Sequence, residues 1–129
     1  MSTFTALRVH NTDGTIESRT EQLILDDLTP GGVVIRARYT SVNYKDVLAC
    51  TGKGAIMRTF PLVAGIDVAG VVESSDDPGI APGDEVVITG CGLGESVDGG
   101  YSQYVRAKPE WVIPLPEGMD LWQTMCLGT

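Results

Sequence analysis

The sequence predicts a mainly β domain of the barrel or sandwich class. Sixteen glycines and seven prolines separate short runs of β-branched residues, which is typical of those folds. Helical periodicity is confined to residues 43–50 and to the residues from Met119 onward. The 129 residues are 43% hydrophobic and 20% charged, which is enough for one hydrophobic core and too apolar for intrinsic disorder.

The first part of the chain predicts three strands. Residues 4–10 form the first, and the Asp13-Gly14 pair that follows favours a type I′ hairpin turn, which requires positive φ angles. The return strand covers about 15–25. After a turn that contains Pro30 and two glycines, residues 33–42 predict a long third strand.

Residues 43–50 change period, because Tyr44, Val47 and Leu48 share one helical face. We expect a helix of about two turns here, followed by a loop over 51–61. Residues 62–74 then resemble one strand that contains Gly65 and Gly70. Internal glycines in a strand indicate a bulge or a close approach of another backbone segment.

The last part of the chain predicts short strands and a final helix. Strands are expected at 85–89, 101–107 and 111–115, with a glycine-rich loop over 90–100. From Met119 onward the apolar residues Leu121, Met125 and Cys126 are nearly aligned on a helix. The sequence stops close to this apolar segment, whereas a domain normally ends in a polar stretch, so we expect further chain beyond it.

Charge and cysteine content exclude several classes of protein. The net charge is −8 with only nine Lys and Arg, which disfavours nucleic acids and anionic membrane surfaces as partners. No apolar run approaches the roughly 18–20 residues of a membrane span, and the N-terminus does not resemble a secretory signal. The three cysteines are scattered and odd in number, which indicates a reducing, cytoplasmic setting.

Three segments occur together in this chain: SVNYKD at 41–46, PLVAGIDVAGVV at 61–72 and PGDEVV at 82–87. Their order and spacing resemble the N-terminal, GroES-like catalytic domain of the medium-chain dehydrogenase/reductase superfamily. The segments TGKG at 51–54, TGCGLGE at 89–95 and GGYSQY at 99–104 are similar to its quinone-oxidoreductase-like branch, which includes NADPH-dependent acryloyl-CoA reductases. The resemblance implies a partly open β-barrel with one or two short helices.

The resemblance also implies a domain organisation. Residues 1–118 would be the GroES-like substrate and catalytic domain. Residues 119–129 would begin the helix that leads to a nucleotide-binding α/β Rossmann domain, which is absent from this chain. We therefore expect the 129 residues alone to be inactive and the full-length protein to be a homodimer.

The metal-binding positions of zinc-dependent relatives are not kept in this sequence. Those relatives carry a cysteine where this chain has Asn43 and a His-Glu pair where it has Ile66-Asp67. Isoleucine cannot bind zinc and a carboxamide is a poor ligand, whereas catalytic zinc needs three protein ligands. The one histidine, His10, lies in the first strand beside no cysteine or carboxylate cluster. We expect no metal, and hence chemistry that is independent of zinc.

Without a Lewis acid, reduction of a C=C bond conjugated to a carbonyl remains accessible, because the carbonyl polarises the alkene. The resemblance implies hydride transfer from NADPH to acryloyl-CoA or a similar enoyl thioester. The protein would orient the reactants and donate hydrogen bonds to the thioester oxygen. The small-molecule substrate is a quinone or enone under a second hypothesis, and a third hypothesis is a non-enzymatic GroES-like interaction module.

By resemblance, Asn43 and Tyr44 face the nicotinamide ring and are the candidate catalytic and cofactor-binding residues. Asn43 has donors and an acceptor for a carboxamide or a substrate carbonyl. Tyr44 can stack on the ring or supply a proton, although an ordinary phenol pKa of about 10 makes it a slow acid. Val47 and Thr129 are further candidate cofactor contacts. The alternative is structural, with Asn43 as a helix N-cap and Tyr44 and Val47 as packing residues.

Several charged residues near these candidates have two interpretations. Asp46 is expected to stabilise the helix start through its charge, and Lys45 to be solvated or to contact a phosphate. Asp67 is a carboxylate in an apolar strand, so we expect it to have a fixed partner and a structural role. Lys53 and Arg58 either attract the phosphates of a CoA ester or are ordinary surface charges.

The glycine-rich loop is similar to a dinucleotide fingerprint only in part. The G-x-G-x-x-G motif requires glycine at position 95, which is Glu95 here, and no helical run follows. We interpret the loop as a lining of the substrate cleft rather than a phosphate site. Cys91 would then be a cleft residue, but no histidine is available to activate its thiol as a nucleophile.

Overall fold

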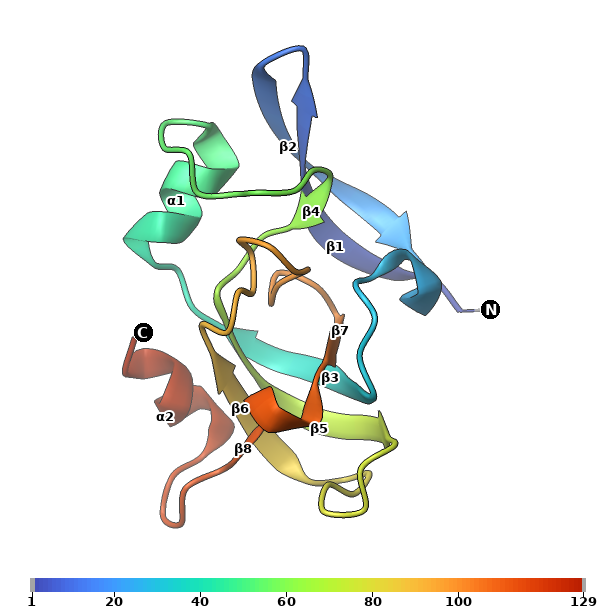
Figure 1. Cartoon of the computed structure of the whole chain (residues 1–129). Helices are drawn as coiled ribbons and strands as arrows, with labels where there is room; N and C mark the ends of the chain where they lie inside the picture. Colours follow the sequence, from blue (N-terminus) through green and yellow to red (C-terminus); the bar gives the residue numbers. More distant parts are fainter. Residues whose placement is uncertain (1, 129) are drawn as a thin grey trace.

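The computed structural model describes residues 2–128 and shows two antiparallel sheets with two short α-helices (Figure 1). The smaller sheet has the order β2-β1-β4 and contains β1 (Phe4–Thr12), β2 (Thr15–Leu23) and β4 (Leu62–Val63). The predicted hairpin turn is confirmed, because Asp13 and Gly14 have φ angles of 52° and 88° and Thr12 pairs with Thr15.

The larger sheet has the order β7-β3-β5-β6-β8. Its strands are β3 (Val33–Thr40), β5 (Asp67–Ser75), β6 (Glu85–Thr89), β7 (Tyr104–Ala107) and β8 (Ile113–Pro114). Single 3₁₀ turns, η1 (Leu25–Asp27) and η2 (Pro109–Trp111), precede β3 and β8. The inward side chains form the main hydrophobic core, in which Ile35, Ile88 and Val105 are almost completely buried.

Backbone hydrogen bonds of residues 101–103 connect the two sheets. Leu7 N donates to Tyr101 O at 2.8 Å in the smaller sheet, and Ala37 N donates to Gln103 O at 2.9 Å in the larger one. The sheets therefore enclose a barrel that remains partly open, as predicted. The expected strand at 101–107 is shorter, since only Tyr104–Ala107 pairs regularly with β3.

The predicted single strand at 62–74 is wrong in one respect: the structure divides it into β4 and β5, which belong to different sheets. Gly65, at φ 101°, lies in the connection, where a side chain would collide with the backbone of Tyr101. Gly70 lies opposite Ala37, beside a register shift between Ala37 and Tyr39. The expectation that these glycines mark a close approach or a bulge is confirmed.

The two α-helices lie on the same side of the molecule in the view of Figure 1. Helix α1 (Tyr44–Thr51) follows β3 and ends at Gly52, whose φ of 74° is the left-handed conformation of a helix C-cap. Helix α2 (Leu121–Cys126) packs on the larger sheet through Leu121 and Met125. Cys126, which the periodicity placed on the same face, is exposed.

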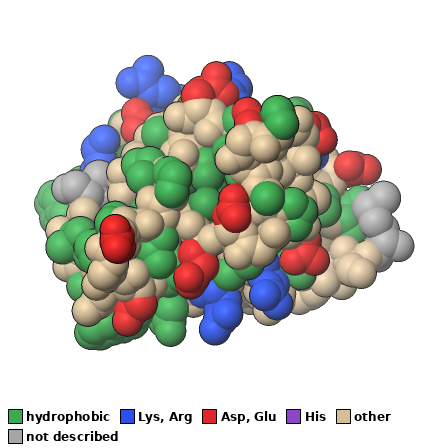
Figure 2. All heavy atoms as spheres, turned by 90° about the horizontal axis from the view of Figure 1, so that it is seen from below, with side chains coloured by type: hydrophobic (Ala, Val, Ile, Leu, Met, Phe, Trp, Pro, Cys, Tyr) green, Lys and Arg blue, Asp and Glu red, His purple; other side chains and the backbone are tan. Residues whose placement is uncertain are grey.

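Acidic side chains are scattered over the face seen from below, and hydrophobic ones gather mainly on the left of that view, the side of α2 (Figure 2). The large hydrophobic side chains left exposed in the described residues include those of Val42, Tyr44, Trp122 and Leu127. No helix within residues 2–128 is long and apolar enough to cross a membrane.

Candidate functional site

Asn43 is the N-cap of helix α1. Its backbone is extended, with φ −108° and ψ 159°, and its carbonyl accepts a hydrogen bond from the Asp46 N–H at 3.0 Å. In return, the Asp46 carboxylate accepts from the Asn43 N–H at 3.0 Å. The structural alternative for Asn43, a helix N-cap, is therefore confirmed.

Asp46 has a larger role than stabilising the start of α1. Its side chain is only 2% exposed, and its second oxygen accepts a hydrogen bond from the backbone N–H of Ile66 at 3.1 Å. Ile66 lies in the connection between β4 and β5. One buried carboxylate therefore joins the helix start to the segment that passes from one sheet to the other.

Asp67, the first residue of β5, is 1% exposed and has fixed partners, as predicted, although they are side chains of Ser41 and Asn43 rather than the expected basic residue or backbone N–H groups. Its Oδ2 accepts from the Ser41 hydroxyl at 2.8 Å and from the Asn43 amide nitrogen at 3.1 Å. The same amide nitrogen lies 2.9 Å from Ser41 Oγ and 3.3 Å from Asp46 Oδ2. Asn43 thus connects two buried carboxylates, and we refer to Ser41, Asn43, Asp46 and Asp67 as the carboxylate network.

Tyr101 extends this network. Its hydroxyl donates to the Ser41 carbonyl at 2.9 Å. Burial raises the pKa of the Tyr101 phenol, and the nearby Asp46 carboxylate raises it further, so this hydroxyl stays protonated. Sequence reasoning did not identify Ser41 or Tyr101 as parts of the site. Ser41 and Tyr101 are 60 residues apart in the chain, so no local pattern could have indicated the contact between them.

Tyr44 and Val47 lie on the outer face of α1, beside the carboxylate network. The Tyr44 side chain is 78% exposed and that of Val47 is 45% exposed. The alternative in which Tyr44 is a core aromatic is therefore wrong, and Val47 is not a buried packing residue. Val42, just before the helix, is also exposed. Thr129, the fourth candidate, lies outside the described residues.

Glu95, in the glycine-rich loop, connects that loop at the surface to helix α1 and to the loop that follows α1. Its carboxylate lies 3.6 Å from Lys45 Nζ on α1 and 3.4 Å from Arg58 Nε in the following loop. Its carbonyl also accepts from the Arg58 N–H at 2.8 Å. Lys45 and Arg58 are thus partly neutralised, while Lys53 lines a separate hollow between α1 and the β1–β2 hairpin.

The glycine-rich loop packs closely against the connection between β4 and β5. Gly99 N donates to Val63 O and Gly100 N donates to Gly65 O, both at 2.9 Å. A side chain at Gly100 would lie 2.3 Å from the carbonyl oxygen of Asp67. The exposed Cys91 thiol donates to the Thr89 carbonyl at 3.5 Å. The role of this loop in a cleft stays a prediction.

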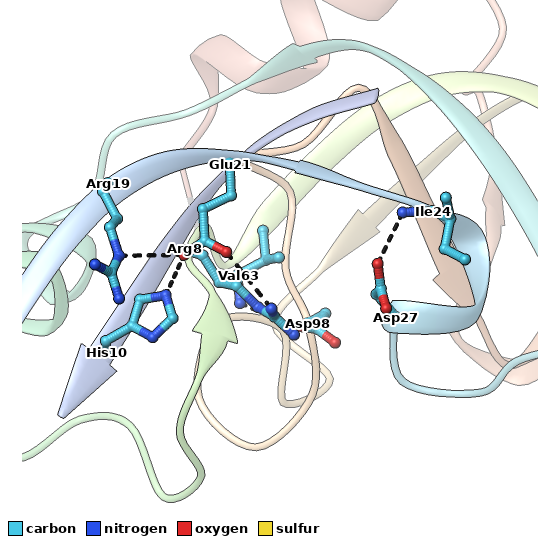
Figure 3. Close-up of polar contacts among 8 residues, drawn as sticks. All are labelled: Arg8, His10, Arg19, Glu21, Ile24, Asp27, Val63 and Asp98. Atoms are coloured by element: carbon cyan, nitrogen blue, oxygen red, sulfur yellow. Dashed lines mark hydrogen bonds and ion pairs between the residues drawn. The ribbon is translucent and has the colours of Figure 1, made fainter. Parts of the chain in front are cut away.

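His10 lies on the β1–β2 hairpin, where its Nε2 contacts the Glu21 carboxylate on the other strand (Figure 3). Arg8 and Arg19 also pair with Glu21, at 3.6 Å and 3.3 Å. Burial raises the pKa of Glu21, but the hydrogen bond and charge of His10 and the two arginines outweigh it, so the pKa is lowered. Within residues 2–128, no three His, Cys, Asp or Glu side chains are grouped as a metal site would need.

The chain matches a known protein family. Residues 29–117 match the alcohol dehydrogenase GroES-like domain. The chain therefore belongs to this family, the N-terminal domain of the medium-chain dehydrogenase/reductase superfamily.

Individual relatives make the position within the superfamily more specific. The chain is 46% identical over 116 residues to acrylyl-CoA reductase AcuI of Ruegeria pomeroyi, a match that covers 90% of this chain and 35% of that protein. It is 42% identical over 130 residues to YhfP of Bacillus subtilis, named for a quinone oxidoreductase activity, and covers 39% of it.

Solved structures give the same result. The crystal structure of B. subtilis YhfP with NAD bound matches 99% of this chain and 39% of the other, with a TM-score of 0.95 and 40% identity. The YhdH oxidoreductase of Salmonella enterica in complex with NADP matches 96% of this chain and 38% of the other, with a TM-score of 0.93 and 40% identity. The chain thus spans between one third and two fifths of these relatives.

Proposed function

We propose that this chain is the substrate-side domain of an NADPH-dependent reductase that acts on a C=C bond conjugated to a thioester carbonyl, as in acryloyl-CoA. The observation that carries the proposal is the start of α1, where a fixed Asn43 lies beside the exposed Tyr44 and Val47. An exposed aromatic ring and a rigid carboxamide are suited to a planar ring that bears an amide group. The 46% identity to an acrylyl-CoA reductase supports this substrate class.

The described residues fit a nicotinamide group. Tyr44 would stack on it, Val47 would contact it and Asn43 would hydrogen-bond its carboxamide, with Thr129 as a further contact. When bound, NADPH supplies the hydride. The side chains of this domain orient the alkene and exclude water from it. We expect no zinc requirement, because Asn43 and Ile66 occupy the positions of zinc ligands in other branches.

The test joins residues 1–129 to the C-terminal two thirds of the R. pomeroyi reductase and follows NADPH absorbance with acrylyl-CoA. We expect the chimera to turn over, and its rate to be unchanged by metal chelators. We expect the 129 residues alone neither to bind NADPH tightly nor to turn over substrate. Tyr44→Phe lowers kcat if the hydroxyl takes part and leaves it unchanged if only the ring is used. Robust reduction by the isolated chain would contradict the proposal that a nucleotide-binding domain outside these 129 residues is needed for activity.

Quinone reduction is the second candidate, favoured by the 42% identity to YhfP. The same chimera, assayed with quinones and with acrylyl-CoA, separates the two through the ratio of kcat/KM values. We also propose a homodimer for the full-length protein and a cytoplasmic location, consistent with the three free thiols. Light scattering of the full-length protein tests the first point. A non-enzymatic interaction module would give no turnover in either assay.

A further inference from the structure

The carboxylate network determines which way the Asn43 carboxamide faces. Its nitrogen lies 3.1 Å from Asp67 Oδ2 and 3.3 Å from Asp46 Oδ2. Carboxylate oxygens accept hydrogen bonds, and Asp67 Oδ2 already accepts from the Ser41 hydroxyl, so the amino group of the amide faces them. The reverse orientation would place the amide oxygen against two carboxylate oxygens that are themselves buried.

The Ser41 hydroxyl reinforces this orientation. It donates its one proton to Asp67 Oδ2 at 2.8 Å, so its oxygen is left to accept from the Asn43 amide nitrogen at 2.9 Å. Both protons of the amide nitrogen therefore have partners inside the domain. The amide oxygen is not among the buried unpartnered atoms. It lies toward the backbone N–H of Asp46 in the capping box of α1, and an amide oxygen has a second lone pair with which to accept from a ligand.

We propose that Asp46 and Asp67 are positioning residues that fix the amide of Asn43, so that the site presents a hydrogen-bond acceptor beside Tyr44. This inference rests on the proposed function for its ligand, which is the carboxamide N–H of the nicotinamide. It also changes the role expected for Asn43. An acceptor cannot stabilise negative charge on a thioester oxygen, so that donor must come from another group.

The orientation is tested first by NMR on the isotope-labelled 129-residue chain, independently of any activity. We expect the two side-chain amide protons of Asn43 to exchange at least tenfold more slowly than those of the exposed Gln123 carboxamide, which is bonded through its oxygen, by the Asp120 N–H, and not through its nitrogen. In Asp67→Asn, exchange of the Asn43 amide protons should accelerate, because a neutral amide no longer excludes the reverse orientation. Rapid exchange of the Asn43 amide protons in the unmodified chain would overturn the proposal.

The consequence for recognition is tested in the chimera with two cofactors. The 3-acetylpyridine analogue of NADPH has no N–H on its ring substituent. We expect its KM to exceed that of NADPH by about tenfold, the effect of one hydrogen bond. Asn43→Ala should bring the ratio of the analogue's KM to the NADPH KM down to about one. Asp67→Asn should reduce the same ratio at least threefold.

Asp98→Asn is the matched control, because Asp98 is a buried carboxylate with no contact to Asn43 among its hydrogen bonds. It should lower stability and leave the ratio of the two KM values unchanged. A ratio that is equal in the unmodified chimera, Asn43→Ala and Asp67→Asn would overturn the recognition step. A chimera inactive with every substrate would contradict the proposed function, while the exchange measurement would still decide the orientation of Asn43.

Discussion

Replacing Asp98 by alanine is the perturbation whose effect on stability follows most directly from the structure. Asp98 is 7% exposed, and its Oδ1 accepts from the N–H of Val63 at 2.8 Å. Its Oδ2 accepts from the N–H and the hydroxyl of Thr29, at 2.8 Å and 2.9 Å. The carboxylate therefore connects the glycine-rich loop to β4 and to the turn before β3.

The magnitude comes from what each donor loses. Val63 is 0% exposed, so its N–H stays without a partner in the variant, which costs about 1–3 kcal/mol. Thr29 is half-buried, so water replaces part of its lost charge-assisted bonds, and we take about 1–2 kcal/mol for them. The two losses together are about 2–5 kcal/mol, a large fraction of the roughly 5–15 kcal/mol typical of a domain.

Urea unfolding followed by circular dichroism measures this difference, and the m value should be unchanged if the native fold is kept. Asp84→Ala is the matched control, because Asp84 makes the same kind of bond, to Ala81 N at 2.9 Å, at an exposed turn. We expect it to cost below about 1 kcal/mol. Equal small losses in the two variants would refute the reasoning that burial of the Val63 N–H determines the cost.

Three further predictions concern other parts of the domain. Gly70→Ala places a Cβ 2.3 Å from the Arg36 carbonyl and should cost at least about 2 kcal/mol in the same unfolding assay, whereas Gly79→Ala, near only the Asp77 side chain, should cost less than half as much. Because the pKa of Tyr101 is raised on folding, stability falls as pH rises above about 10, and Tyr101→Phe should reduce that alkaline loss. Because the pKa of Glu21 is lowered on folding, its contribution is present above the ordinary value of 4.5 and is lost as pH falls below it, so thermal melts of Glu21→Gln should depend less on acid pH than those of Glu17→Gln.

The strands were predictable from sequence because their determinants are local. The Asp13-Gly14 turn fixes the first hairpin, and β-branched runs between turn residues place β3 and β6 within two residues of their observed bounds. The division of 62–74 into β4 and β5 was not predictable in this way. It depends on Gly65 packing against Tyr101, a contact between residues far apart in the chain.

The candidate site was predictable only in part, and for the same reason. The spacing of Asn43 and Asp46 indicates a helix start, and family resemblance points to Asn43 and Tyr44. Neither reveals that Asp46 bonds Ile66 or that Asp67 bonds Asn43, because those partners are 20 and 24 residues apart. The exposure of Tyr44 was equally hidden, since its spacing from Val47 suits a buried face as well as an open one.

The position of α1 explains why an acidic chain keeps two carboxylates buried at this point. A buried carboxylate is costly unless its hydrogen bonds are satisfied, so an apolar pair would hold the helix against the sheet at least as well. An apolar pair could not, however, fix the direction of the Asn43 amide or bond the backbone of Ile66. The carboxylate network therefore costs some stability and fixes a single geometry at the helix start. That geometry, rather than the strand scaffold, decides which groups Asn43 and the exposed Tyr44 present to a ligand.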